Sequence, residues 1–598
     1  MSSFYNIAER LTRMAREIPD SIAIAEPLFH HGKAKRNSSG KREYRTVTFA
    51  ELDRDTDRIA AGLQALGVTP RMRLVIMVRQ GIDFISLVFA LYKTGATLVL
   101  IDPGMGVKKM LQCLKEVNPD GFLGIPSAQY ARILYRRWFP NAKFNLAVGK
   151  SLFLPCLLTL DKLRKRAPAK PQDPKMKLDD PAAIIFTSGS TGVAKGVLYT
   201  HRMFKTQVEE ITKRLNIKPG AIDLVGFPFF GLFDAGMGTT AVIPDMDTTK
   251  PASVDPKLFL EAAVDWQVTQ AFGSPALWTA VSRYCVRNNV KISTLKQTAI
   301  AGAPVSFELL RNLRRILPDD AVIVTPYGAT ESLPLAAIES REVLEETCFK
   351  TSQGAGVCVG KFFDPPLEHR IIPISDAPIP RLSDVTACSD GQIGELIVSG
   401  PQCSPRYVTR EEANALALIE GEDGQIWRRV GDVGYFDDQD RFWFCGRKSH
   451  RVETPYGPMF SIPCEAISNE SPNVFRSALV GVPLPPDFQE PEVVVKRAKE
   501  FRSVWKEPVM IVEPTAEARP ADKVAEERLK KETLNLLKKS PLTSSINKVL
   551  VCNSLPVDAR HNAKINRELL AKWATARLAG KNVKLHNGPS DDDLPPAK

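Results

Sequence analysis

One short run of small and hydroxyl-bearing residues constrains this chain more than any other feature. Residues 186–196 read FTSGSTGVAKG and follow the apolar run Ala182–Ile185, which is typical of a buried strand. Glycines let backbone N–H groups approach phosphate oxygens closely, hydroxyls add donors, and Lys195 supplies a compact positive charge. The run predicts a phosphate-binding loop. It lacks the G-x-x-x-x-G-K-[ST] pattern of Walker-type loops, so a different nucleotide-binding fold is expected.

Strand-like and helix-like segments alternate along the 598 residues. Apolar runs begin at Leu74, Thr97, Ala182 and Ala321, and amphipathic segments of helical length separate them. This alternation favours an α/β fold with layered parallel sheets. Several of the strands run directly into turns rich in Gly, Ser, Thr or Pro, where open α/β sheets bind their ligands. The segment VLYTHRMFKTQVEE, which follows the phosphate-binding loop, is expected to begin a helix.

The phosphate-binding loop resembles the T-S-G-[ST]-T-G-x-P-K-G motif of the acyl-adenylate-forming (AMP-binding) enzyme superfamily. The single departure is Ala194, which stands in place of proline. The resemblance implies ATP and Mg²⁺ as cofactors and a reaction that joins a carboxylate to AMP and releases pyrophosphate. The nucleotide-binding residues of this loop would be Thr187, Ser188, Gly189, Ser190, Thr191, Gly192 and Lys195.

Two further motifs follow in the order found in the superfamily. AGAPVS at Ala301 and PYGATES at Pro326 resemble its two adenine-side loops. By this resemblance Tyr327 would stack on adenine. Thr330 would bind phosphate as a catalytic residue, and Glu331 would hold Mg²⁺. Thr187 would be a second metal ligand. The nucleotide-binding residues expected in these two motifs are Gly302, Ala303, Pro304, Tyr327, Gly328, Ala329, Thr330 and Glu331.

The later motifs supply ribose-binding and catalytic residues. GELIVSG at Gly394 and GDVGYFDDQDRFWFCGRK at Gly431 resemble the end of the superfamily's large domain. Asp432 would accept both ribose hydroxyls, because a carboxylate can receive two O–H donors. Arg447 would support the ribose or a phosphate. Lys564, in PVDARHNAKINRELL, matches the C-terminal catalytic lysine, which bridges the substrate carboxylate and the α-phosphate.

The expected domain organisation combines a large N-terminal domain of layered α/β sub-domains with a small mobile α+β domain. Residues 1–446 form the large domain, in which the polar, proline-rich residues 166–181 are an exposed connection. Residues 447–579 form the small domain, whose closure brings Lys564 to the site. Residues 580–598 are too polar to pack and are expected to be a disordered tail.

The amino-acid sequences of several segments resemble those of the β-lactone synthetases of bacterial long-chain olefin biosynthesis. These segments include FTSGSTGVAKGVLYTHRMF, FPFFGLFDAGMGTTAVIPDMD and VDARHNAKI. Those enzymes adenylate a long-chain 2-alkyl-3-hydroxy acid, whose own hydroxyl then attacks the activated carbonyl and avoids a bimolecular encounter. The resemblance also implies a complex with a thiolase-like enzyme, a reductase and an α/β-hydrolase of the same pathway.

Two alternatives stay open on the sequence alone. A long-chain acyl-CoA synthetase would form the same kind of adenylate and pass the acyl group to CoA. Against it, Ser449 stands where the superfamily hinge commonly has Asp or Lys, and TPYGPMFSIPCEAI replaces the usual glycine-rich thiol-side segment. The other alternative is a non-catalytic scaffold docked on a membrane or partner. The intact Lys195, Glu331, Asp432 and Lys564 argue against it.

Two features near the phosphate-binding loop concern the acyl group. His201 is a candidate catalytic residue that would accept a proton, although a role in shaping the acyl pocket is favoured. The segment GFPFFGLFDAGMGTT combines aromatic and small residues, which suits either a tunnel for alkyl chains or ordinary core. Its aromatic residues are Phe227, Phe229, Phe230 and Phe233.

The net charge of +12 is concentrated in one part of the chain. Between Lys108 and Lys177, fifteen Lys or Arg face four Asp or Glu, an excess of eleven. Aromatic and aliphatic residues border these charges, which suits peripheral contact with an anionic membrane surface, although a solvated basic surface is the favoured interpretation. Neither zinc-finger spacing nor an RNA-binding signature is present, so no nucleic acid partner is expected.

Cysteine usage and hydropathy indicate the compartment. The ten cysteines are scattered without metal-ligand spacing, which suits a reducing cytosol. The N-terminus lacks the apolar core of a secretory signal. The longest apolar runs are shorter than the roughly 20 residues that a membrane-spanning helix needs. We expect a cytoplasmic protein, with any membrane contact peripheral and at the inner surface.

Overall fold

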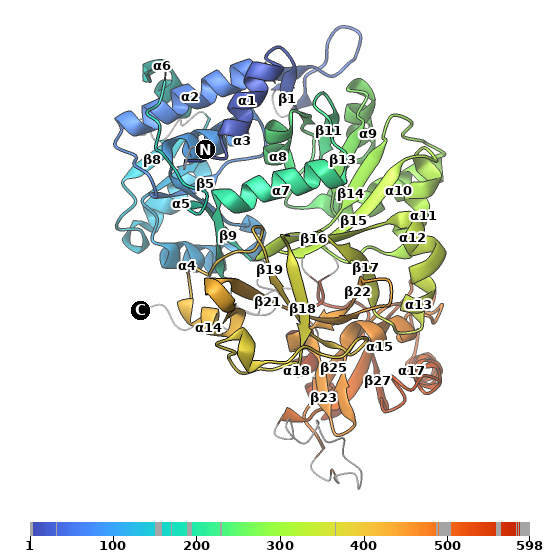
Figure 1. The fold of residues 1–598 in the computed structure, drawn as a ribbon. Helices are drawn as coiled ribbons and strands as arrows, with labels where there is room; N and C mark the ends of the chain where they lie inside the picture. The colour runs from blue at the N-terminus through green and yellow to red at the C-terminus, as the bar shows by residue number, and fades with distance from the viewer. Residues whose placement is uncertain are drawn as a thin grey trace. The chain divides into compact units, whose positions relative to one another are not determined.

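The computed structural model divides the chain into two compact units. The structure describes residues 4–30, 33–149, 158–168, 170–187, 194–227, 230–364, 366–485, 488, 504–557, 564–581, 583 and 585. Unit 1 comprises Met1–Leu335, Asp364–Glu368 and Val398–Arg428, and unit 2 comprises Ala336–Phe363, His369–Ile397 and Arg429–Lys598. Figure 1 shows the strands and helices of both units.

The first sheet of unit 1 carries the phosphate-binding loop. Its six strands lie in the order β10-β9-β6-β5-β7-β8, and all pairs are parallel except β9 with β10. The predicted strands at Leu74, Thr97 and Ala182 are thereby confirmed. The strands are β5 (Arg73–Met77), β6 (Thr97–Leu100), β7 (Gly121–Gly124), β8 (Phe144–Ala147), β9 (Pro181–Phe186) and β10 (Gly196–Thr200). The accompanying helices are α2 (Phe49–Ala65), α3 (Ile82–Thr94), α4 (Val107–Val117), α5 (Pro126–Leu134) and α6 (Leu160–Arg166).

The second sheet of unit 1 has the order β15-β14-β13-β11-β12-β1-β4, and it confirms the strand predicted near Ala321. Its strands are β1 (Ile22–Pro27), β4 (Tyr44–Thr48), β11 (Ile222–Val225), β12 (Thr240–Val242), β13 (Gln270–Gly273), β14 (Gln297–Ile300) and β15 (Val322–Ala329). The associated helices are α1 (Glu9–Glu17), α7 (His201–Arg214), α8 (Phe230–Met237), α9 (Pro256–Asp265), α10 (Pro275–Asn288) and α11 (Phe307–Ile316).

Helix α3 lies between the two sheets of unit 1. It contacts β6 of the first sheet and β1 of the second. Every residue of α3 except Asp83 is buried, as expected for a helix that is apolar on all sides and packed between layers. The core of unit 1 is therefore continuous from one sheet to the other.

The prediction that a helix begins directly after the phosphate-binding loop is wrong. Residues Gly196–Thr200 form strand β10, which pairs with β9, and α7 begins only at His201. The Thr200 side chain accepts a hydrogen bond from the backbone N–H of Met203 and so caps the helix there. The loop therefore connects two antiparallel strands.

Unit 2 contains a sheet with the order β18-β19-β21-β22-β17-β16 and a three-stranded sheet, β25-β26-β27. Alternate residues of β26 face opposite ways, so Met510 and Val512 pack with α17 while Val509 and Ile511 pack with α18. The strands are β16 (Ser332–Glu339), β17 (Val357–Phe362), β18 (Glu368–Ile372), β19 (Gly394–Ser399), β21 (Ile426–Phe436), β22 (Arg441–Arg447), β25 (Val474–Val482), β26 (Glu507–Pro514) and β27 (Lys548–Val551). The helices are α15 (Ser461–Ser468), α17 (Lys523–Leu537) and α18 (Arg567–Leu578).

The expected domain boundary after residue 446 lies inside unit 2, at the end of β22. The expectation that residues 447–579 move as a separate domain stays a prediction. Residues 170–180, within the expected connection, contain no helix or strand, and Met176 is their one buried side chain. Most of the expected tail, 580–598, lies outside the described residues.

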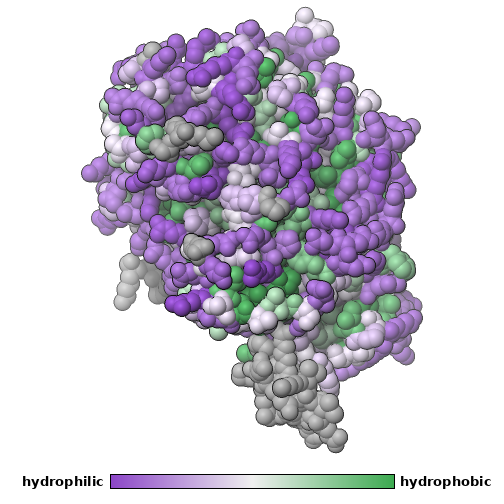
Figure 2. Space-filling model, in the orientation of Figure 1, coloured by the Kyte–Doolittle hydropathy of each residue, from purple (hydrophilic) through white to green (hydrophobic). Residues whose placement is uncertain are grey.

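Within the described ranges, no helix has the length and hydrophobicity to cross a membrane. The face of the molecule in Figure 2 is covered mainly by hydrophilic residues.

Candidate active site

The two ends of the phosphate-binding loop are fixed to each other at the β9–β10 hairpin. The backbone N–H of Thr187 donates to the carbonyl of Lys195 (3.1 Å), and the N–H of Lys195 donates to Thr187 Oγ1 (3.2 Å). These hydrogen bonds hold the two described ends of the loop, Thr187 and Lys195, together. The predicted residues between these ends lie outside the described residues, namely Ser188, Gly189, Ser190, Thr191 and Gly192.

Lys195 and Glu331 meet around the side chain of Tyr407. The ammonium of Lys195 lies 4.8 Å from the centre of the Tyr407 ring, and the Tyr407 hydroxyl donates to Glu331 Oε1 (2.6 Å). Burial, together with the charge of Glu331, raises the pKa of Tyr407, so the phenol keeps its proton and acts as the donor. Unit 1 thus brings the predicted phosphate-binding cation and the predicted metal ligand into contact with one tyrosine.

The adenine-side motifs lie at the carboxyl ends of neighbouring parallel strands. Strands β14 and β15 are paired, with Ala299 opposite Val324. A loop follows β14 and contains Gly302, Ala303 and Pro304, whereas Tyr327, Gly328 and Ala329 lie on β15 itself. Ligands of open α/β sheets bind at such strand ends.

Thr330 and Glu331 form the turn between β15 and β16. The hydroxyl of Tyr199 on β10 donates to the carbonyl of Thr330 (2.6 Å). The N–H of Ser404 donates to the carbonyl of Glu331 (2.7 Å). The turn is therefore fastened to the strand that follows the phosphate-binding loop, which brings four predicted residues, Thr187, Lys195, Thr330 and Glu331, into one connected network.

In unit 2, Asp432 and Arg447 lie opposite each other on β21 and β22. Arg447 Nη1 is 2.9 Å from Asp432 Oδ1 and also donates to the carbonyl of Val430 (2.9 Å). Asp432 is almost fully buried, and Arg447 is partly exposed. The guanidinium therefore offsets the charge of the buried carboxylate.

Lys564 is half-buried and lies in unit 2 directly before Ile565, which pairs with Val557. The residues between, 558–563, lie outside the described residues. Three positions later, Arg567 Nη2 is 2.7 Å from both carboxylate oxygens of buried Glu465. This ion pair fixes the start of α18 and, with it, the chain on one side of Lys564.

His201 is buried at the start of α7. Its Nδ1 accepts the backbone N–H of Ile7 (3.3 Å), and its ring contacts Tyr92 edge to face. Burial lowers the pKa of His201 to about 4, so the imidazole is neutral and a weak base at pH 7. These contacts favour a structural role, although the catalytic assignment stays a prediction.

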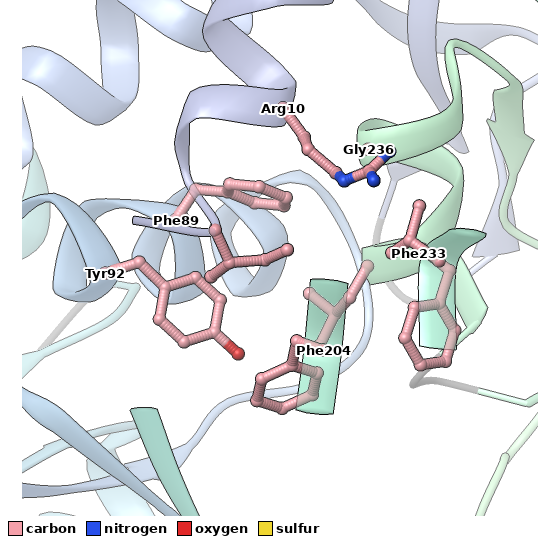
Figure 3. Close-up of a pocket in the computed structure, with 9 residues that line it drawn as sticks. Arg10, Phe89, Tyr92, Phe204, Phe233 and Gly236 are labelled. Atoms are coloured by element: carbon pink, nitrogen blue, oxygen red, sulfur yellow. The ribbon is translucent and has the colours of Figure 1, made fainter. Parts of the chain in front are cut away.

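An apolar cavity of about 20 Å³ lies beside Tyr92, lined by residues of α1, α3, α7 and α8. Figure 3 shows Phe89, Tyr92, Phe204 and Phe233 around it, with Arg10 at one side. A cavity of this volume holds about one water molecule, so an alkyl chain would need its lining to move.

The four phenylalanines of the predicted tunnel have different surroundings. Phe230 stacks on Phe272 with ring centres 3.7 Å apart, and Phe227 packs against the same ring at 6.0 Å. Phe233 lines the apolar cavity, and Phe229 lies outside the described residues. Phe227 and Phe230 therefore pack as core in this structure.

Sequence reasoning missed Tyr407 and Arg428. The Arg428 guanidinium lies 4.2 Å from the centre of the Tyr407 ring. A usable signal was present, because Arg428 interrupts the apolar strand that leads into the Asp432 motif. Buried charges of this kind are rare unless they serve a site or an ion pair.

The residues present suit magnesium held mainly by a nucleotide. Across the described ranges, no three His, Cys, Asp or Glu side chains cluster as a metal site. Mg²⁺ is commonly bound through one or two protein oxygens together with substrate phosphates. Glu331 and Thr187, the predicted metal ligands, would supply oxygen atoms of that kind.

Comparison with known proteins identifies the family. The model of the AMP-binding enzyme family matches residues 12–408. The olefin beta-lactone synthetase of Xanthomonas campestris is 42% identical over 96% of this chain and 98% of its own length, and that of Stenotrophomonas maltophilia is 40% identical over 96% and 98%.

Solved structures show the same fold. The amide bond synthetase McbA from Marinactinospora thermotolerans superimposes with a TM-score of 0.72 at 19% identity, covering 95% of this chain and all of its own. The o-succinylbenzoate coenzyme A synthetase of Bacillus subtilis, in complex with ATP and magnesium ion, gives 0.68 at 19% identity, covering 93% and 98%. From the matched family model and the identity along almost its whole length, the chain belongs to the AMP-binding enzyme family and, within it, to the family of the olefin β-lactone synthetases.

Proposed function

We propose that this chain uses ATP to adenylate a long-chain 2-alkyl-3-hydroxy acid and closes the adenylate to a β-lactone. The observation that carries the proposal is the 42% identity to an olefin β-lactone synthetase over 96% of the chain. The products are the β-lactone, AMP and pyrophosphate, and no second acyl acceptor takes part.

In the first step, a carboxylate oxygen of the substrate attacks the α-phosphorus of ATP. The bond from this phosphorus to the pyrophosphate oxygen breaks, and pyrophosphate leaves. Lys195 and Thr330 hold phosphates, and Lys564 offsets the negative charge that develops between the carboxylate and the α-phosphate. Asp432 holds the ribose. The ion pair with Arg447 supports this role, because it places a cation beside a buried carboxylate.

In the second step, the substrate's 3-hydroxyl oxygen attacks the acyl carbon, and the bond from that carbon to the phosphate oxygen breaks. AMP leaves, and the hydroxyl proton passes to solvent. A hydroxyl already attached near the carbonyl avoids the entropic cost of a bimolecular encounter. The low pKa of His201 supports its assignment to the acyl pocket more than to this proton transfer.

Mg²⁺ would be held by Glu331, Thr187 and the nucleotide phosphates, and it would supply charge neutralisation of the triphosphate. The chain's own contribution is to hold the Glu331 carboxylate in place through Tyr407.

The contacts around Ser449 support a reaction that ends without CoA. Lys448 Nζ donates to the carbonyl of Ser375 (2.8 Å), and Arg451 Nη2 is 2.5 Å from Asp376 Oδ2. Residues on both sides of Ser449 are thus bound to one short segment of unit 2, which contains Ser375 and Asp376. A rotation that presents a thiol would have to break these contacts.

We place the protein in the cytoplasm with two kinds of partner. The hydrophobic intermediates of olefin synthesis favour a complex with a thiolase-like enzyme, a reductase and an α/β-hydrolase. The second partner is an anionic membrane surface at the basic window 108–177.

Exposed apolar residues support the membrane contact. On α5 and the turn after it, Leu134 is 77% exposed and Trp138 is 37% exposed. Lys115 of α4 lies 5.4 Å from the Trp138 ring. Within the described part of the chain, neither Lys115 nor Arg137 forms an ion pair. Liposome sedimentation should show binding that requires anionic lipid and is lost in Trp138→Glu. Equal binding to neutral vesicles would contradict this contact.

A comparison of two substrates tests the proposed function. With ATP, Mg²⁺ and no CoA, a 2-alkyl-3-hydroxy acid should support continuous pyrophosphate release. The matched acid without the 3-hydroxyl should give about one equivalent per enzyme, because its adenylate cannot close. Release that needs CoA with both acids would instead identify an acyl-CoA synthetase.

A further inference from the structure

Arg428 is a fully buried cation that forms no ion pair with a carboxylate among the described residues. Its exposed fraction is 0%, and Nη1 donates to the carbonyl of Ser404 (3.2 Å). In the part of the chain that the structure describes, Nε and Nη2 have no hydrogen-bond partner. Burying a guanidinium in this way is costly, so a functional reason for its retention is expected.

The group that Arg428 contacts is the ring of Tyr407. The guanidinium lies 4.2 Å from the ring centre, and Lys195 lies 4.8 Å from the same centre. Both distances are within the range of cation–π attraction. The ring is therefore fixed by two cations, and its hydroxyl is directed to Glu331 Oε1 at 2.6 Å.

The backbone around Tyr407 is fastened to β10, the strand that follows the phosphate-binding loop. Tyr407 pairs with Val197, and the N–H of Val408 donates to the carbonyl of Gly196 (2.9 Å). The N–H of Gly196 donates in turn to Thr409 Oγ1 (2.7 Å). A shift of Tyr407 would therefore move both the end of the phosphate-binding loop and Glu331.

We infer that Tyr407 is a positioning residue that holds Glu331 for the magnesium ion of bound MgATP, and that Arg428 holds Tyr407 in turn. The Tyr407 hydroxyl occupies Oε1 and leaves Oε2 of Glu331 for the metal. The inference rests on the proposed function, because it requires a nucleotide–metal site at Glu331. It assigns Tyr407 and Arg428 to the support of the predicted metal ligand.

Binding measurements without turnover separate this role from a general structural one. Isothermal titration calorimetry would compare the Kd for ATP with Mg²⁺ and with EDTA. In Tyr407→Phe, which keeps the ring and loses the hydroxyl, the Kd for MgATP should rise about tenfold, a typical loss for a hydrogen bond to a charged group. The Kd for metal-free ATP should stay within about twofold of that of the unmodified protein.

Two comparisons sharpen the test. Tyr435→Phe is a matched control, because the Tyr435 hydroxyl donates to the carbonyl of Ala355 (3.0 Å) and not to Glu331. This substitution should change neither the Kd for MgATP nor the Kd for metal-free ATP. Arg428→Met should reproduce the selective loss for MgATP, while Arg428→Lys should restore most of it. If Tyr407→Phe does not fold, the comparison of Arg428→Met with Arg428→Lys still tests the inference.

Three results would overturn the inference. Unchanged MgATP binding in both Tyr407→Phe and Arg428→Met would show that Glu331 needs no such support. An equal loss with and without Mg²⁺ would show a structural role. If the unmodified protein bound no ATP at all, the proposed function itself would fail, and the inference with it.

Discussion

Asp432 and Arg447 face each other across β21 and β22, with the guanidinium Nη1 2.9 Å from the carboxylate Oδ1. The pair joins the motif assigned to the ribose with Arg447, the last residue of β22 and the first residue after the predicted domain boundary. Any movement about this boundary would therefore act on a residue that contacts Asp432, the carboxylate proposed to bind the ribose.

Replacing Asp432 should weaken nucleotide binding. In Asp432→Ala the ribose loses its acceptor and Arg447 loses its counter-ion, so the KM for ATP should rise about 10- to 100-fold, as expected for lost charged hydrogen bonds. Steady-state pyrophosphate release at varied ATP measures this. Asp438→Ala, an acidic residue in the turn that follows β21, is the control and should keep the original KM. An unchanged KM in Asp432→Ala would remove this residue from the site.

Replacing Lys564 should abolish adenylation while preserving the fold. Lys564→Ala removes the charge that offsets the developing negative charge at the α-phosphate, so the rate of pyrophosphate release should fall about 100-fold or more. Lys572→Ala on α18 serves as the matched control, because that side chain is exposed. Equal rates in Lys564→Ala and the control would contradict the assignment.

The buried ion pair of Glu395 should contribute strongly to the stability of unit 2. Glu395 is 0% exposed and binds Arg429 Nη2 at 2.7 Å and Lys448 Nζ at 3.0 Å. Glu395→Gln leaves buried cations without a counter-charge, which should lower the free energy of unfolding by about 3–5 kcal/mol. Urea denaturation measures this. The exposed Glu345→Gln should change it by less than about 0.5 kcal/mol.

Asp223 and Asp234 form a buried carboxyl pair that should make stability depend on pH. Burial raises the pKa of Asp223 to about 7 and raises that of Asp234 well above its ordinary range, with the neighbouring carboxyl as a further cause for Asp234. Between pH of about 4 and 7 the folded state therefore holds a proton that the unfolded chain has released. The free energy of unfolding should then fall as pH rises, by up to about 1.4 kcal/mol per pH unit for each such proton.

The matched variant for this pair is Asp234→Asn, which mimics the protonated carboxyl. Urea denaturation at pH 5, 6 and 7 should show a smaller loss of stability with pH in the variant than in the unmodified protein. Identical pH dependence in the two proteins would show that the pair does not hold the proton.

The motifs could be predicted from the sequence because each combines a strand end with small or charged residues. The strands predicted near Leu74, Thr97, Ala182 and Ala321 are all present in the structure. The start of α7 could not be predicted in the same way, because VLYT suits a strand or a helix and only pairing with β9 decides between them. The contact of Tyr407 with Glu331 joins residues 76 positions apart, which no local pattern encodes.

The fate of the carboxyl oxygens shows whether the substrate is adenylated and then closed to a β-lactone. A 2-alkyl-3-hydroxy acid labelled with ¹⁸O in both carboxyl oxygens would be incubated with the protein, ATP and Mg²⁺ in the absence of CoA, and the products analysed by mass spectrometry. One label should appear in AMP and one in the β-lactone carbonyl, because carboxylate attack on phosphorus and closure by the 3-hydroxyl each determine one oxygen. Unlabelled AMP, or a product that forms only when CoA is added, would contradict the account.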